Sequence, residues 1–249
     1  MSETFVLITG AWHGGWAWRP VAQRLRAAGH RVLAPTLPGL RDGDDPTAYS
    51  LSDVIDSVVD LMEANDLRDV TAVAHSWGGF VLTGAVPRIA GRLRRLVYLS
   101  AFVPADGVCV LEETPPNEMD ELSLAHSSGD NTVLPPYEVW QACFMQDASS
   151  DVQRMVYDLL VPQPLQYLTQ PVAPIDPVAL GIPATYLQGT EDIALPPGEF
   201  GYERFAERLG VKPIPVPGSH EGLLTRPAEL ARSLLAVSSD RTGAAAQVV

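Results

Sequence analysis

The sequence predicts an α/β fold with about six mostly parallel strands, helices on both faces of the sheet, and an inserted, mainly helical cap. Short apolar runs alternate with segments of helical spacing, which is typical of strands joined by right-handed helical crossovers. One run, Val70–Ala74, ends abruptly at H-S-W-G-G (residues 75–79), and a helical segment follows it. Between Pro104 and Pro183 the alternation stops and prolines become dense.

The length and composition suit one domain and exclude several classes of partner. A chain of 249 residues, 46% hydrophobic and 19% charged, can bury one sizeable core, so we expect a domain over residues 1–237 with the cap at about 104–183. Seventeen basic against thirty acidic residues give a net charge of −13, which repels nucleic acid. No run of about eighteen apolar residues indicates a membrane segment, and a cytoplasmic location is the expectation. A small-molecule substrate is the expected partner, and the oligomeric state is left open, a homodimer included.

The first third of the chain predicts two strands and two helices. The run Thr4–Thr9 (T-F-V-L-I-T) is a short strand that leads into a glycine-rich loop. Apolar residues at helical spacing predict a helix over Trp16–Ala28, and Arg31–Thr36 is the second strand. Ser50 is suited to cap a helix that continues through Ala64, because the apolar residues after it share one face.

The strand Arg95–Ala101 precedes the proline-dense insert. About eighty residues of this kind cannot easily form their own core, which favours a cap over a second domain. The strand–helix alternation then resumes, and the small, polar stretch 238–249 is expected to be a disordered tail. The remaining predicted elements are helical stretches Pro136–Met145 and Asp151–Leu160, strands Ala184–Gln188 and Lys212–Val216, and helices Pro197–Leu209 and Arg226–Val237.

Ser76 stands where the central strand turns into the following helix. Such a turn raises a serine over the carboxyl edge of the sheet, and its sharp bend needs small neighbours. Gly78 meets this need two residues after the serine, whereas Ala74 replaces the glycine that usually stands two residues before it. The pattern is therefore A-x-S-x-G instead of G-x-S-x-G. The alternative is a plain strand–turn–helix with an incidental serine.

A serine hydroxyl needs a base to accept its proton, and five histidines compete for that role. His220 follows the last predicted strand, at the carboxyl edge of the sheet where Ser76 also lies. This position makes His220 the preferred base. The other four are His30 at the opposite edge, His75 with a side chain expected to point away from Ser76, His126 in the cap, and His13 in the glycine-rich loop.

The histidine in turn needs a carboxylate that holds one tautomer and stabilises the developing charge. Asp192 follows the penultimate predicted strand, again at the carboxyl edge, and is the preferred acid. Glu191 is adjacent and spacing does not exclude it, and Asp106 is the next alternative. The chain order Ser76, Asp192, His220 is the one found in hydrolases with a nucleophile elbow.

Nearly the whole chain, from Thr4 to about Val237, resembles an α/β-hydrolase, and more narrowly the plant methylesterase and hydroxynitrile lyase group with its bacterial relatives. The resemblance implies a catalytic triad of Ser76, Asp192 and His220. It also implies an oxyanion hole made by the backbone N–H groups of Ala11 and Trp77. The residues that carry it are the loop G-A-W-H-G-G-W-A-W at 10–18, the elbow, S-A-F-V-P at 100–104 and G-S-H at 218–220.

Aromatic residues near the predicted site suggest an apolar binding pocket. Trp12, Trp140 and Phe144 are expected to line it, although ordinary packing in the core or cap explains each of them singly as well. No metal and no organic cofactor is expected. No histidine pairs with a cysteine at metal-ligand spacing, and the glycine loop lacks the phosphate-binding G-x-G-x-x-G order.

These features predict a serine hydrolase that cleaves a small, largely apolar carboxylic ester through an acyl-enzyme. One alternative is a same-fold pathway enzyme acting by lactone or thioester hydrolysis, cyclisation or hydroxynitrile cleavage. Another is a non-catalytic receptor for a small ligand. For the lyase branch the resemblance implies a threonine at the position of Gly10 and a lysine after the catalytic histidine. Here Glu221 follows the histidine, and its negative charge opposes a departing cyanide anion.

Overall fold

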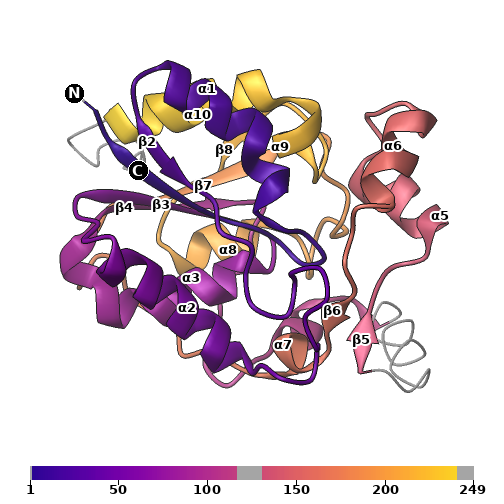
Figure 1. Cartoon of the computed structure of the whole chain (residues 1–249), viewed down its shortest axis with the longest axis horizontal. Coiled ribbons are helices and arrows are strands. Elements are labelled where there is room, and N and C mark those ends of the chain that lie inside the picture. The colour runs from indigo at the N-terminus through magenta and orange to yellow at the C-terminus, as the bar shows by residue number, and fades with distance from the viewer. Residues whose placement is uncertain (1, 117–130, 240–249) are drawn as a thin grey trace.

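The computed structural model describes residues 2–116 and 131–239, and at its centre lies a six-stranded sheet (Figure 1). Its strands run in the order β2-β1-β3-β4-β7-β8. Every neighbouring pair in it is parallel, so the predicted fold class is confirmed. The strands are β1 Thr4–Ile8, β2 Arg31–Leu33, β3 Val70–His75, β4 Leu93–Leu99, β7 Ala184–Gly189 and β8 Ile214–Val216.

The sheet is covered by helices on both faces, which explains why strand β1 is almost entirely apolar. Along β1, Phe5 and Leu7 enter one buried cluster, whereas Val6 and Ile8 enter another. Successive side chains of a strand point to opposite faces, so both faces of β1 are buried. Helices α1 (Arg19–Ala27) and α10 (Pro227–Ser239) cover one face, and α2 (Leu51–Ala64), α3 (Gly78–Ile89) and α8 (Glu203–Arg208) cover the other (Figure 1).

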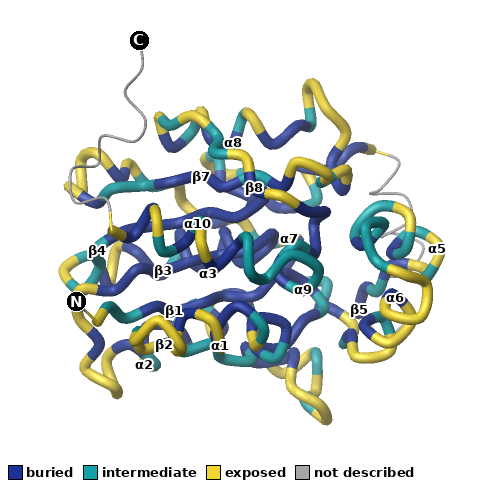
Figure 2. The backbone as a smooth tube through the Cα atoms, turned by 90° about the horizontal axis from the view of Figure 1, so that it is seen from above, coloured by how far each residue is buried: buried dark blue, intermediate teal, exposed yellow. Residues whose placement is uncertain are grey.

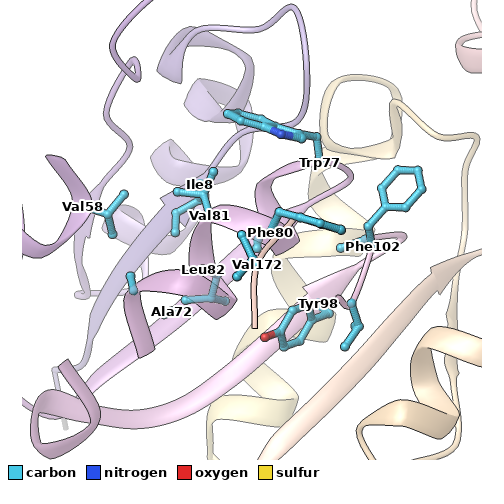
Figure 3. Close-up of a cluster of buried hydrophobic side chains, with 14 of the residues drawn as sticks. Ile8, Val58, Ala72, Trp77, Phe80, Val81, Leu82, Tyr98, Phe102 and Val172 are labelled. Carbon is cyan, nitrogen blue, oxygen red and sulfur yellow. The ribbon is translucent and has the colours of Figure 1, made fainter. Parts of the chain in front are cut away.

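The core under α3 extends into the insert between β4 and β7. Phe80 and Val81 of α3 pack in the same buried cluster as Ile8 of β1, and Val172 of the insert joins them (Figure 3). Part of the insert therefore shares the main core. A separate small cluster within the insert contains the buried residues Trp140, Met145, Val156 and Leu160. The domain limits derived from the sequence stay a prediction.

The described part of the insert consists of short helices and a two-stranded antiparallel sheet, β5–β6, which the sequence analysis did not anticipate. Helices α5 and α6 form a lobe beside the main sheet, and its outer surface is mostly exposed (Figure 2). The described elements of the insert are the 3-10 helix Val110–Glu113, β5 Thr132–Val133, α5 Tyr137–Val139, the π-helix Trp140–Phe144, α6 Ser150–Tyr157, β6 Gln163–Pro164 and α7 Gln166–Thr169.

Several predicted boundaries shift for local reasons. Ser50 caps α2 in a reciprocal capping box with Asp53, as its sequence position suggests. Helix α8 begins only at Glu203 because the preceding stretch contains two prolines and Gly198, whose φ is +100°. Helix α10 continues to Ser239, so the first two residues of the predicted tail are helical, and the rest lies outside the described residues. The remaining short helices are the 3-10 helices Gly15–Trp18 and Ala90–Arg92 and the helix α9 Gly222–Thr225.

Within residues 2–116 and 131–239, no helix has both the length and the apolar character needed to cross a membrane. The cytoplasmic location stays a prediction.

Candidate active site

Ser76 lies just beyond β3 in a left-handed backbone conformation, with φ at +52°. This conformation is costly for a residue other than glycine and persists only where the surroundings hold it. Here the Ser76 N–H donates to the Leu99 carbonyl at 3.2 Å, and the Ser76 carbonyl accepts from the Phe102 N–H at 3.1 Å. These bonds to the end of β4 hold the turn, and the serine remains 8% exposed.

Glycines allow three segments to meet around Ser76. A Cβ atom on Gly78 would collide with the Thr9 carbonyl oxygen. One on Gly10 would lie 2.9 Å from the Ser76 Cβ and 3.0 Å from Nδ1 of His75. Carbon atoms in relaxed contact are about 3.5–4.0 Å apart. The loop after β1 can therefore approach the serine this closely only because position 10 is a glycine. Ala74, which replaces the usual glycine, is fully buried in β3.

Asp192 and His220 meet at the carboxyl edge of the sheet, beyond β7 and β8. The Nδ1–H group of His220 donates to Oδ2 of Asp192 at 2.9 Å, and the two side chains are 4% and 0% exposed. An ionised carboxylate can only accept, so the ring proton lies on Nδ1 in the neutral imidazole. The Nε2 atom then carries a lone pair that can accept a proton. The backbone N–H of Ala194 also donates to Asp192, at 3.0 Å.

The charges of this pair are mutually stabilised. Burial acts to lower the pKa of His220, but the Asp192 carboxylate, its hydrogen bond and the nearby Glu221 outweigh burial and raise the pKa above its ordinary value. Burial also acts to raise the pKa of Asp192, whereas the charge and hydrogen bond of His220 hold it below its ordinary value. The pair therefore combines an anionic Asp192 with an imidazole that readily accepts a proton.

The other acids and histidines lie elsewhere. Glu191 and Asp106 are exposed, unlike the buried Asp192 side chain. His30 packs edge-on against Phe5 near the start of β1. Ser76 follows the end of the parallel neighbouring strand β3, so the two residues lie at opposite edges of the sheet. His126 lies outside the described residues.

His75 lies closer to the site than its position in the elbow suggested. Its ring packs against that of His220, with the centroids 4.7 Å apart, and its Nε2 lies 3.0 Å from the His220 carbonyl oxygen. Burial lowers the pKa of His75 well below its ordinary value, and the charges at His220 and His13 lower it further. His75 is therefore a neutral support behind His220.

Tyr202, which the sequence analysis missed, touches both members of the pair. Its hydroxyl donates to Oδ1 of Asp192 at 3.1 Å and lies 3.1 Å from Nδ1 of His220. The residue precedes α8, and its side chain is almost fully buried. No short motif marks this tyrosine, because nine residues of irregular chain lie between it and Asp192.

The two backbone donors expected to form an oxyanion hole flank Ser76. Trp77 follows the serine directly, and Ala11 lies in the loop that Gly10 brings against it. Within the described chain, neither N–H has a backbone acceptor. By contrast, the adjacent N–H of Trp12 donates to the side chain of Gln163 at 3.1 Å.

Ser76 and His220 line a cavity of about 450 Å³ whose walls are mostly apolar. Of the three pocket residues predicted from the sequence, Trp12 and Phe144 line the cavity. Trp140 is not among the lining residues: it is fully buried, and its ring stacks on that of Phe144 with the centroids 5.6 Å apart. The other lining residues are Ala11, Trp77, Phe102, Val110, Leu111, Thr114, Val133, Leu134, Pro135, Pro136, Val139, Cys143, Leu168, Ala194, Leu195 and Tyr202.

One group of side chains has the composition of a metal site. Ligand atoms of His75, His220 and Glu221 lie within 4.8 Å of one another. However, Nε2 of His75 faces the His220 carbonyl oxygen, and Nδ1 of His220 faces Asp192. These nitrogens already have partners, so the group is better described as packed side chains than as a set of ligands. The absence of a metal cofactor stays a prediction.

Comparison with known proteins places this geometry in context. The family model described as "Alpha/beta hydrolase family" matches residues 5–233. A carbendazim hydrolyzing esterase of Nocardioides sp. is 45% identical over 130 residues, which cover 50% of this chain and 52% of that protein, about half the length of each. Salicylic acid-binding protein 2 of Nicotiana tabacum is 29% identical over 262 aligned positions, covering 94% of this chain and 96% of that protein.

A solved structure also matches closely. An extracellular alpha/beta-hydrolase from a Paenibacillus species superimposes with a TM-score of 0.90 at 30% identity, covering 96% of this chain and 100% of that one. Its description states that it shares structural and functional homology with the tobacco salicylic acid-binding protein 2.

Proposed function

The chain belongs to the alpha/beta hydrolase family, and on that premise we propose that it is a serine esterase that cleaves small, neutral, largely apolar carboxylic esters. The observation that carries the proposal is the convergence of Ser76 and the Asp192–His220 pair on one apolar cavity. A strained serine, a histidine with its free Nε2 and a buried carboxylate are the parts that acyl transfer requires.

In the proposed first half-reaction, Nε2 of His220 accepts the Ser76 hydroxyl proton as Oγ attacks the ester carbonyl carbon. The carbonyl oxygen becomes negatively charged and accepts hydrogen bonds from the Ala11 and Trp77 N–H groups. Preorganised donors of this kind are each worth about 3 kcal/mol of barrier, because they need no reorganisation at the moment of reaction. The intermediate then collapses, the alcohol leaves with the proton from His220, and the acyl group remains on Ser76.

In the second half-reaction, water takes the place of the alcohol. His220 accepts a proton from the water, the resulting hydroxide attacks the acyl carbon, and the same two donors bind the oxyanion. Collapse releases the carboxylic acid and returns the proton to Ser76. Asp192 holds the ring of His220 in one tautomer and stabilises its positive charge in both halves.

The walls of the cavity support a neutral substrate. Apart from the reacting groups, the polar residues among the described lining residues are Thr114, Cys143 and Tyr202, and within residues 2–116 and 131–239 no charged side chain other than His220 lines the cavity. Bringing a charged substrate group into such a cavity is costly, because the described apolar wall residues do not compensate the lost hydration. A cavity of about 450 Å³ lined by apolar and aromatic residues suits a compact acyl or ring portion.

Hydroxynitrile cleavage is disfavoured by two positions. A threonine at position 10 would place its Cβ 2.9 Å from that of Ser76, so the loop would have to move. Glu221 is buried beside His220 and brings negative charge where the lyase branch would have a lysine. Both features support hydrolysis over release of an anionic cyanide.

Binding of a small aromatic acid is a second candidate, favoured by the likeness to a protein named for salicylic acid binding. The Ala11 and Trp77 N–H groups would receive its carboxylate, as they would a product acid. This role is compatible with slow ester turnover at the same cavity.

A substrate panel tests the proposal. Wild type and Ser76→Ala are assayed on p-nitrophenyl acetate, methyl esters of aromatic acids, a lactone, a thioester and mandelonitrile. We expect Ser76-dependent hydrolysis of the aromatic methyl esters and no cyanide release. Fast, Ser76-dependent cyanide release without ester turnover would reverse the assignment, and no turnover together with tight binding of an aromatic acid would favour the receptor role.

A further inference from the structure

Glu221 and His13 form a buried contact behind the proposed site. Oε2 of Glu221 lies 3.4 Å from Nε2 of His13, and the side chains are 1% and 3% exposed. Within the described part of the chain, neither atom has a hydrogen-bond partner of its own. An unpartnered carboxylate in such a place is strongly disfavoured, so each group depends on the other for compensation.

The second ring nitrogen of His13 fixes the loop after β1. Its Nδ1 lies 2.6 Å from the Ala11 carbonyl oxygen. A carbonyl oxygen only accepts, so Nδ1 carries a proton and donates it, which leaves Nε2 facing Glu221. The His13 ring also lies between the rings of Trp16 and Trp140, each with its centroid 5.6 Å away. The ring therefore has one orientation.

This loop needs such support because its backbone is strained. Trp12 has φ at +66°, in the left-handed region that residues with side chains avoid. The bond from His13 holds the carbonyl on one side of Trp12, and Gln163 holds the Trp12 N–H. The proposed oxyanion donor, the Ala11 N–H, belongs to the residue just before the strained position.

We propose that Glu221 is a positioning residue that, through His13, holds the Ala11–Trp12 turn in place relative to His220. Glu221 is joined covalently to His220, and His13 is bonded to Ala11, so their contact ties the loop of the base to the loop of the oxyanion donor. Glu221 does not line the cavity and acts on the reaction only through these neighbours. The inference rests on the proposed esterase function.

Four substitutions test this role. Glu221→Met removes the carboxylate at similar volume, Glu221→Gln keeps a polar group that can donate to Nε2 of His13, and His13→Phe keeps a ring between the two indoles without either nitrogen. Glu207→Gln, at an exposed glutamate, is the matched control. Kinetics on an aromatic methyl ester are measured with the affinity for a trifluoromethyl ketone that mimics the tetrahedral intermediate.

We expect Glu221→Met and His13→Phe to lower kcat about 10- to 100-fold with little change in KM, because a donor displaced by a fraction of an ångström weakens only the transition state. The affinity for the trifluoromethyl ketone should fall by the same factor. Glu221→Gln should recover most of the loss, and Glu207→Gln should show none. The double variant Glu221→Met with His13→Phe should be no worse than the poorer single variant, because the tie is already broken.

Wild-type kcat in folded Glu221→Met, or losses that multiply in the double variant, would overturn the inference. If Glu221→Met does not fold, His13→Phe decides it, and an unchanged kcat there contradicts the proposal. Urea unfolding of the same proteins measures the coupling between His13 and Glu221 without substrate. An inactive wild type would therefore count against the esterase function alone, whereas additive losses of stability would count against the tie.

Discussion

The hydroxyl of Tyr202 donates a 3.1 Å hydrogen bond to Oδ1 of Asp192, the carboxylate oxygen that His220 does not contact. It also lies 3.1 Å from Nδ1 of His220. A donor in addition to His220 and the Ala194 N–H helps to fix the plane of the carboxylate and moderates its basicity. We therefore expect Tyr202 to fix the orientation of the Asp192 carboxylate relative to the His220 ring.

Replacing Tyr202 with phenylalanine should affect kcat and the pH profile together. Loss of a hydrogen bond to a charged group costs about 1.5 kcal/mol, so kcat should fall roughly tenfold. The freed carboxylate becomes a stronger partner for the imidazolium, so the acid limb of kcat/KM should move to higher pH. Tyr98→Phe, which removes a buried hydroxyl bonded to Thr83, is the control and should leave that limb in place. An unshifted limb in Tyr202→Phe would show that the tyrosine merely packs.

The pH dependence of the wild type follows from the raised pKa of His220. The base must be neutral in the free enzyme, so kcat/KM should rise with pH through an apparent pKa above the ordinary histidine value of about 6.5. His75 has a pKa well below that value and stays neutral throughout, so the limb should have a slope of one. Kinetics between about pH 5 and 9 check this, and a slope of two or a midpoint below 6 would contradict it.

Gly10→Thr tests whether the close approach of the loop is needed. The added Cβ would lie 2.9 Å from that of Ser76, so the loop with the Ala11 N–H must retreat. Loss of one oxyanion donor lowers kcat about 10²- to 10³-fold, and a fall of this order is expected without any gain of mandelonitrile cleavage. Gly91→Ala, at a glycine with open space around it, should retain full activity. Cyanide release by Gly10→Thr would show that this position alone selects the chemistry.

Glu113 should matter for stability more than any surface acid. Its buried carboxylate faces Arg204 at 2.8 Å and Arg208 at 2.6 Å, and so joins the insert to α8. Removing one partner of a buried ion pair typically costs about 3–5 kcal/mol, so Glu113→Gln should lower the free energy of unfolding by a few kcal/mol. Asp66→Asn, at an exposed pair with Arg68, should cost less than about 1 kcal/mol. Equal effects in urea unfolding would contradict the distinction.

The parts of the site that could be predicted from the sequence are those encoded by neighbouring residues. The elbow around Ser76 can be recognised from one short stretch, residues 74–78, and Asp192 and His220 each follow a recognisable strand. Because the carboxyl ends of parallel strands share one edge, the order of the strands was sufficient to bring the pair to the same side of the sheet as the serine.

Contacts between distant segments could not be read in this way. Tyr202 reaches Asp192 from irregular chain, and His13 meets Glu221 across more than two hundred residues. A helical stretch does not reveal which of its aromatic rings faces the cavity, and of Trp140 and Phe144 only Phe144 lines it. The β5–β6 pair escaped detection because each strand has only two residues.

The central claim, that Ser76 becomes covalently acylated, is tested most directly by labelling with a fluorophosphonate. Attack by Oγ on phosphorus expels fluoride and leaves a stable phosphonyl ester that mimics the acyl-enzyme. Intact mass measurement and peptide mapping should show one adduct per chain in the wild type, located on Ser76, and none in Ser76→Ala. An adduct on any other residue, or undiminished labelling of Ser76→Ala, would contradict the claim.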